Sequence, residues 1–121
     1  MGQMQIIYHM LPATIWQALA PQADYVAETI ATEGFIHCTR EPTRLREVAN
    51  RFYRHLEGEF LILAIDSAAL QAELRWEKAD GHLFPHIYGP IERRAIVGIH
   101  TFPRAADGTF QQPDLPQEVA S

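Results

Sequence analysis

Residues 60–65 form a continuous apolar run, Phe-Leu-Ile-Leu-Ala-Ile, which constrains the fold more than any other segment of the chain. A run of this kind is typical of a strand that is buried on both faces. Gly58 precedes the run and Asp66 follows it, so the sequence predicts a break at each end. We therefore expect a central strand with side chains packed against both of its faces.

Shorter segments around this run predict further strands and two helices. The additional strands are expected at residues 3–10, 35–39, 74–78, 86–88 and 95–102, with 74–78 at the edge of a sheet. One helix is predicted between Pro12 and Pro21. A longer helix is predicted from Pro42 to Gly58, because apolar residues recur there at i, i+3, i+4 and i+7. Residues 22–33 fit neither period.

The order of these segments predicts an α+β fold. Strand–helix–strand alternation does not persist along the chain, which argues against a doubly wound parallel sheet. We expect a mixed or mainly antiparallel split sheet, with two helices in the N-terminal half packed on one side. At 121 residues the chain suits one globular domain, predicted over residues 1–110. Residues 111–121 contain Pro113 and Pro116 and are predicted as a loose C-terminal tail.

Composition and charge exclude several classes of protein. The net charge of −5 argues against a nucleic-acid partner, although it permits a small anionic ligand held by a few arginines. No apolar run approaches the ~20 residues that a membrane span needs, and the first residues lack the pattern of a signal peptide. Cys38 is the single cysteine, so the sequence predicts no internal disulfide and a cytoplasmic protein.

Three of the six histidines lie in apolar or aromatic runs, each predicted as a strand or strand end. They are His9, His37 and His86. A buried imidazole needs a partner, because an unpaired buried polar group costs roughly 1–3 kcal/mol. Each ring therefore either bonds to the main chain as a structural residue or lines a shared pocket. His86 and Tyr88 share one strand face, so both can enter the same pocket.

Other chemistries receive weaker support from the sequence. His82 and His86 have the spacing of helical zinc ligands, but Gly81 and Pro85 exclude a helix there, and no metal is expected. Cys38 follows His37 on the opposite strand face, so this pair does not form an activated thiol.

Two arginines lie at the start of the longer helix. Arg40 and Arg44 either contact ligand phosphates or lie on a solvated helix face.

Five strings of residues resemble domain of unknown function family 952, a family of small bacterial and plant proteins. They lie at residues 8–9, 33–39, 48–53, 74–77 and 84–90, and GFIHC and FPHIYGP are the most specific. The resemblance covers nearly the whole chain. It implies a fold grouped with the ADP-ribosyltransferases, which bind NAD in a cleft between two small antiparallel sheets.

The resemblance also implies roles for individual residues. Tyr8 and His9 are similar to a first motif in which the histidine holds a ribose of NAD. Residues 34–39, which end in Thr39, are similar to a second motif, and His37 takes its stacking role. The third motif normally supplies a glutamate, but residues 86–88 contain none, and Glu92 falls after Gly89-Pro90. This departure argues against protein mono-ADP-ribosylation.

The related RNA 2'-phosphotransferases also lack that glutamate and use two histidines, which suits His9 and His37. The acidic balance of the chain nevertheless favours a small nucleotide over RNA.

The leading hypothesis is therefore an NAD- or nucleotide-binding domain, a glycosyl or phosphoryl transferase with His9, His37, His86 and Tyr88 as catalytic residues. Its ligand-binding residues are Tyr8, His9, His37, Thr39, Arg40 and Arg44. One alternative is a binding module that kept the fold without catalysis, and a metal-dependent hydrolase is the third hypothesis. The sequence specifies no oligomeric state.

Overall fold

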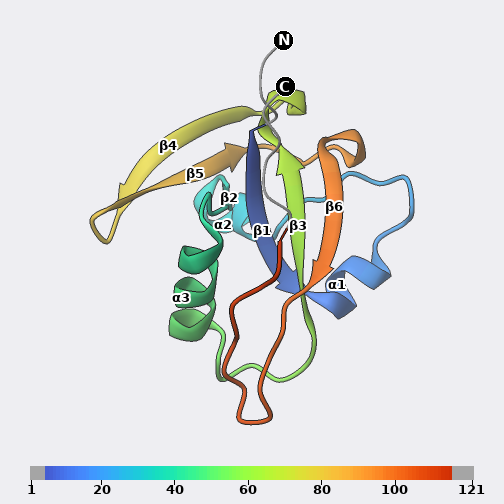
Figure 1. Cartoon of the computed structure of the whole chain (residues 1–121). Helices are drawn as coiled ribbons and strands as arrows, with labels where there is room; N and C mark the ends of the chain where they lie inside the picture. The colour runs from blue at the N-terminus through green and yellow to red at the C-terminus, as the bar shows by residue number, and fades with distance from the viewer. Residues whose placement is uncertain (1–4, 116–121) are drawn as a thin grey trace.

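The computed structural model describes residues 5–115 and shows two small antiparallel sheets with short helices around them (Figure 1). In chain order the elements are β1 (Ile6–Pro12), α1 (Ala13–Ala18), α2 (Thr29–Glu33), β2 (Ile36–His37), α3 (Pro42–Phe52), β3 (Phe60–Asp66), the 3₁₀ turn η1 (Ser67–Ala69), β4 (Glu73–Ala79), β5 (His82–Tyr88), the 3₁₀ turn η2 (Arg93–Ala95) and β6 (Ile96–Thr101). The α+β class and the antiparallel split sheet are confirmed.

The first sheet has the order β1-β3-β6, and the apolar run of residues 60–65 is its central strand. Successive side chains of a strand point to opposite faces of this sheet and pack into two separate cores. Leu63 and Ile65 belong to one core, and Ile62 and Ala64 belong to the other. The prediction of a strand buried on both faces is therefore confirmed.

The second sheet has the order β2-β5-β4, so β4 is an edge strand as predicted. One face of this sheet packs against the core that also contains Leu63, through the side chains of Ile36, Leu74 and Ile87. The two sheets join at an isolated bridge, where the backbone N–H groups of Tyr8 and Thr39 each donate to the other residue's carbonyl, at 2.7 and 2.8 Å. The predicted strand of residues 35–39 is therefore split into β2 and this bridge.

The helices differ from the expectation in number, length and position. Residues 29–33, which had no assignment, form α2, and Gly34 ends it with a left-handed φ of 90°. The longer helix α3 ends at Phe52 rather than at Gly58, because Tyr53 leaves helical geometry. The Tyr53 ring then lies 5.5 Å from Phe60. Among the described residues, three helices rather than two therefore lie in the first half of the chain.

The helices also lie on opposite faces of the first sheet, which corrects the expectation of one side. Trp16 of α1 and Ile30 of α2 pack against the core of Leu63. Leu45 and Ala49 of α3 are buried in the core of Ile62. The sheet alternation that separates the two cores explains this arrangement, because each apolar face needs its own cover.

The segment after β6 returns to the core that α3 covers. Phe110 is buried there, and its backbone N–H and carbonyl both bond to the side chain of Asn50. Pro113 is buried as well, and Leu115 packs against the same core. Residues 116–121 lie outside the described residues, so the boundary at residue 110 stays a prediction. No helix within residues 5–115 is long and apolar enough to cross a membrane.

Candidate functional site

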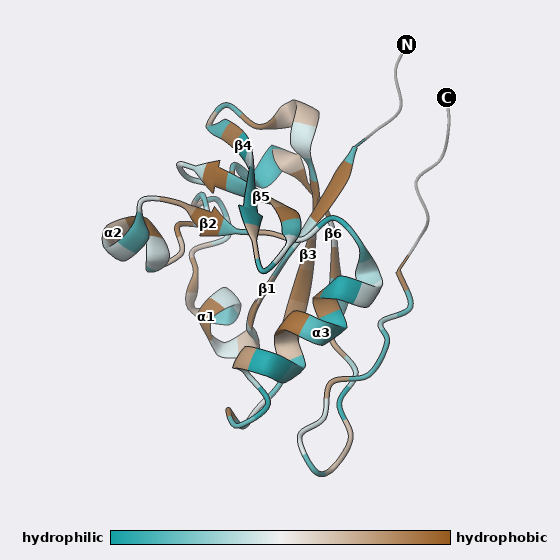
Figure 2. Ribbon diagram, turned by 90° about the vertical axis from the view of Figure 1, so that its left-hand side faces the viewer, coloured by the Kyte–Doolittle hydropathy of each residue, from teal (hydrophilic) through white to brown (hydrophobic). Residues whose placement is uncertain are grey.

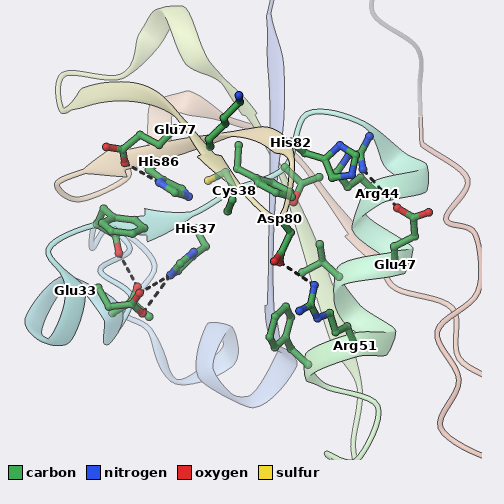
Figure 3. A pocket seen from close by; sticks show the side chains of 18 of the residues that line it. Glu33, His37, Cys38, Arg44, Glu47, Arg51, Glu77, Asp80, His82 and His86 are labelled. Atoms are coloured by element: carbon green, nitrogen blue, oxygen red, sulfur yellow. Dashed lines mark hydrogen bonds and ion pairs between the residues drawn. The ribbon is translucent and has the colours of Figure 1, made fainter.

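A hollow of about 950 Å³ lies between α3, the end of α2 and the polar face of the second sheet (Figure 3). Its position follows from the alternation of the strands. Ile36 and Ile87 point into the core, so their neighbours His37, His86 and Tyr88 point the other way and line the hollow. The predicted residues Thr39 and Arg44 also line it.

One side of the hollow holds a carboxylate shared by a histidine and a tyrosine. Oε1 of Glu77 accepts hydrogen bonds from the Tyr88 hydroxyl at 2.6 Å and from Nδ1 of His86 at 2.8 Å. The bond from Tyr88, followed by that from His86, holds the pKa of Glu77 below its usual value. The same bond raises the pKa of the Tyr88 phenol, because ionisation would remove the proton that Tyr88 donates to the carboxylate. Glu77 is therefore the charged member of this group.

Nε2 of His86 is left open to the hollow. The His86 side chain is only 8% exposed, and within residues 5–115 Nδ1 is the ring nitrogen that has a hydrogen-bond partner. No fully buried side-chain nitrogen or oxygen in that part of the chain lacks a partner, so solvent reaches Nε2. Because a carboxylate can only accept, Nδ1 carries a proton, and in the neutral ring Nε2 presents a lone pair to any ligand.

A second carboxylate–imidazole pair lies beside the first. His37 and His86 are directly opposite in the β2–β5 register, and their ring centroids are 5.2 Å apart. Nε2 of His37 contacts the Glu33 carboxylate at 3.1 and 3.2 Å, with both side chains about half exposed. The Phe35 ring stacks on His86 at 4.2 Å and also contacts His37. Two oriented imidazoles and an aromatic face therefore lie within one part of the hollow.

His9 does not line the hollow, which corrects the expectation of three histidines in one pocket. Its Nδ1–H donates to the His37 carbonyl at 2.7 Å, and its Nε2 accepts from the Tyr25 hydroxyl at 3.0 Å. Burial lowers the pKa of His9 to about 4, so the ring is neutral. Both ring nitrogens are engaged, which leaves no free polar atom for a ribose. The geometry instead makes His9 the structural histidine that supports the backbone of β2.

Two other predicted binding residues also lie away from the hollow. Tyr8 is buried in the core that α3 covers, on the opposite sheet face from His9. Arg40 does not line the hollow, and its Nη1 donates to the Ile6 carbonyl at 3.1 Å. Arg44 does line it, and its guanidinium contacts Glu41 and Glu47 loosely, at 3.8 and 3.7 Å. The predicted phosphate-binding pair therefore contributes one arginine to the hollow.

Sequence reasoning missed Glu77, Glu33, Arg51 and Asp80, all of which line the hollow. The alternation of residues 74–78 contained a signal for Glu77, since it places that residue on the strand face opposite to Leu74. Glu33 lies four residues before His37, but α2 itself was not predicted. The ion pair between Arg51 and Asp80 joins segments distant in sequence and left no local signal.

The geometry of the described residues supports neither thiol catalysis nor a metal site. Cys38 is 3% exposed, and burial raises the pKa of its thiol far above the usual value. Within residues 5–115 no three histidine, cysteine, aspartate or glutamate side chains converge as metal ligands. The expectation that no metal is bound stays a prediction.

These features define an α+β protein with two three-stranded antiparallel sheets and a histidine-lined hollow beside the second sheet. The chain belongs to the family described as "Protein of unknown function (DUF952)", whose profile matches residues 10–99. The predicted family membership is therefore confirmed.

Solved structures of the protein CC0527 from Caulobacter crescentus are similar to this chain. The crystal structure is 27% identical with a TM-score of 0.75, covering 88% of this chain and 93% of that one. The crystal structure of a double mutant of the same protein is 26% identical to this chain with a TM-score of 0.74, and the coverage of both chains is the same. The solution NMR structure is 27% identical with a TM-score of 0.71, and the match covers 89% of this chain and 93% of that one. No curated protein is significantly similar to the chain.

Proposed function

We propose that the hollow binds a nucleotide of the NAD class and that the protein transfers a glycosyl or phosphoryl group from it. The observation that carries this proposal is the Glu77–His86 pair, with Nε2 of His86 open to a large hollow. A histidine oriented in this way by a carboxylate is a common general base. The proposal narrows the predicted catalytic set to His86, with Tyr88 and His37 beside it.

The size and lining of the hollow suit such a ligand. Ligand pockets have volumes of about 300–1,000 Å³ and combine apolar walls with a few oriented polar groups. The hollow lies near the upper end of this range, which leaves room for more than one ring system. Phe35 and Phe84 supply aromatic surface, while His37 and Tyr88 supply rings with polar edges for ribose hydroxyls.

The residues of the hollow also suggest how a proton moves. Nε2 of His86 takes a proton from an attacking hydroxyl, and Glu77 stabilises the imidazolium that forms. The oxygen of that hydroxyl forms a bond to the ribose carbon or the phosphorus of the ligand, the glycosidic or phosphoester bond at that atom breaks, and nicotinamide or the remaining fragment leaves with the electron pair of that bond. Such general base catalysis contributes ~10²–10⁴-fold to a rate.

Glu77 further supplies a carboxylate that the third motif of the ADP-ribosyltransferases normally provides. Its Oε1 is occupied by His86 and Tyr88, while Oε2 has no hydrogen-bond partner within residues 5–115. That oxygen keeps its lone pairs for a hydrogen bond, and we propose that a ribose hydroxyl donates it. The two small antiparallel sheets also support an ADP-ribosyltransferase-like fold.

Calorimetric titration tests the proposal with NAD, ADP-ribose and adenosine as probes. We expect binding to the wild-type protein and a marked loss in His86→Ala and His37→Ala. His55→Ala is the matched control, because His55 is exposed and lies outside the hollow. Absence of binding by every probe at millimolar concentration would overturn the proposal.

A binding module without catalysis is the second candidate function. It is favoured by the absence of a glutamate from β5, the strand that carries His86 and Tyr88. Prolonged incubation with NAD, followed by mass spectrometry for nicotinamide, separates the two functions. Sustained release supports the transferase, whereas nucleotide binding without any release supports the module.

A further inference from the structure

One end of the hollow is closed by an ion pair between α3 and the tip of the β4–β5 hairpin (Figure 3). Nη1 of Arg51 lies 2.7 Å from Oδ2 of Asp80, and both residues line the hollow. Figure 3 shows the two carboxylate–imidazole pairs on the other side of the hollow. The hollow therefore has an imidazole end and an arginine end.

The hairpin turn fixes the position of Asp80. Asp80 and Gly81 connect paired residues Ala79 and His82, with φ values of 51° and 79°. Two consecutive residues with positive φ are typical of a type I′ turn, which suits the twist of a two-residue hairpin. Within residues 5–115, Asp80 is the one residue other than glycine that has a positive φ. Aspartate and asparagine tolerate this left-handed backbone region better than most residues. The turn therefore brings Asp80 near α3, where its carboxylate contacts Arg51.

The guanidinium of Arg51 keeps donors free for another acceptor. Its Nε and Nη2 have no hydrogen-bond partner in the part of the chain that the structure describes. Its central carbon lies 5.1 Å from the centroid of the Phe52 ring, which limits the orientation of the side chain. Arg51 is two helical turns after Arg44, so both side chains lie on the α3 face that lines the hollow.

The ion pair itself is easy to exchange. The side chains of Arg51 and Asp80 are 61% and 58% exposed, and ion pairs in such positions contribute little to stability. A phosphate group offers more oxygens and more charge than one carboxylate, and it matches the fork of an arginine. A phosphate near this end of the hollow therefore competes well with Asp80.

We propose that Arg51 binds a phosphate of the ligand in the hollow and that Asp80 holds its guanidinium until that phosphate displaces it. This inference rests on the proposed function, because it assigns the phosphate-bearing part of the nucleotide to the arginine end. The sugar and base then extend toward His37 and His86. A ligand without phosphate leaves the Arg51–Asp80 ion pair in place and gains no affinity from Arg51.

Titration of four variants with ADP-ribose and adenosine tests this assignment. Asp80→Asn keeps the turn and removes the competing charge, so we expect ADP-ribose to bind roughly two- to five-fold tighter. Arg51→Gln removes the guanidinium, and we expect about ten-fold weaker binding of ADP-ribose. Arg46→Gln is the matched control, because Arg46 is exposed on α3 and does not line the hollow.

Adenosine and the double variant complete the test. Adenosine lacks phosphate, so its affinity should be the same in all variants and in the wild type. In the double variant, Asp80→Asn should have no effect once Arg51 is Gln, because the two residues act through one guanidinium.

Two results overturn this inference in different ways. If adenosine and ADP-ribose both bind the wild type but neither Asp80→Asn nor Arg51→Gln changes the affinity for ADP-ribose, this assignment alone is wrong. If neither probe binds the wild type, the proposed function fails together with it.

Discussion

The two sheets of the molecule contrast in what they bury. In the first sheet β3 is almost fully buried, with Ile62, Leu63 and Ile65 at 0% exposure. In the second sheet the edge strand β4 has no buried residue, and β5 is exposed at its start. Figure 2 shows this difference as hydrophobic colour along β1 and β3 and hydrophilic colour along β4.

We infer from this contrast that the first sheet mainly stabilises the fold, whereas the second sheet carries the polar side chains of the hollow. The first sheet lies between two apolar cores and contributes buried side chains to both of them. The second sheet contributes one face to a core and leaves the other for polar side chains. His9 connects the two, because it lies in β1 and bonds to the carbonyl of His37 in β2. Four predictions test this separation.

The largest effect is expected from Leu63→Ala in the first sheet. Removal of this fully buried side chain leaves a cavity and should lower the free energy of unfolding by about 2–5 kcal/mol. Leu83→Ala in the second sheet is the control, since Leu83 is 56% exposed and should change it by less than about 0.5 kcal/mol. Urea unfolding measures both values, and comparable losses in the two variants would contradict the separation.

Acid should weaken the connection between the sheets. The pKa of His9 falls from 6.5 to about 4 on folding, so between these values the unfolded chain binds the extra proton. Stability therefore decreases as the pH falls from 6.5 toward 4, by about 2 kcal/mol between pH 7.5 and 5. Urea unfolding at both pH values measures this loss. His9→Asn should show a smaller dependence on pH, and an unchanged dependence would remove His9 as its source.

Glu77→Gln should affect the site more than the fold. An amide can donate as well as accept, so it no longer fixes the proton of His86 on Nδ1. We expect about ten-fold slower nicotinamide release, because the imidazolium loses its counter-charge. Nitrogen NMR of the imidazole should show a mixture of tautomers, a change that purely structural damage does not predict. The free energy of unfolding in urea should differ from that of the wild type by less than about 0.5 kcal/mol, since Glu77 is partly exposed.

The smallest effect is expected at Cys38. Its thiol is buried in the core between the sheets, and burial raises its pKa. We expect no labelling of the folded protein by a maleimide at pH 7.5 and complete labelling in urea. Cys38 also lines the hollow, so labelling of the folded protein would show that a reagent in the hollow reaches the thiol.

The parts of the fold that were predictable are those in which burial determines the local sequence. Continuous apolar residues identified β3, and alternation identified β4 as an edge strand. The end of α3 was not predictable, because Phe52 continues the apolar pattern although its side chain is 49% exposed. Burial on one helix face therefore does not determine where the helix ends.

The pairing of site residues was predictable within a single strand. His86 and Tyr88 share a face of β5, and the sequence placed them together. Glu77 joins them through the β4–β5 register, which the two-residue turn at Asp80 and Gly81 sets and which the alternation within one strand does not reveal. His9 was misplaced because a buried ring bonded to a neighbouring strand looks, in sequence, like one that meets a ligand.

The open edge of β4 has a consequence for how the molecules behave at high concentration. Unpaired strand edges tend to add strands from other molecules, and charged side chains along the edge oppose this. Within β4, Glu73, Arg75, Glu77 and Lys78 are charged, and Arg75 is paired with Glu73. The strand that supplies Glu77 to the hollow therefore also discourages fibre-like stacking of the protein.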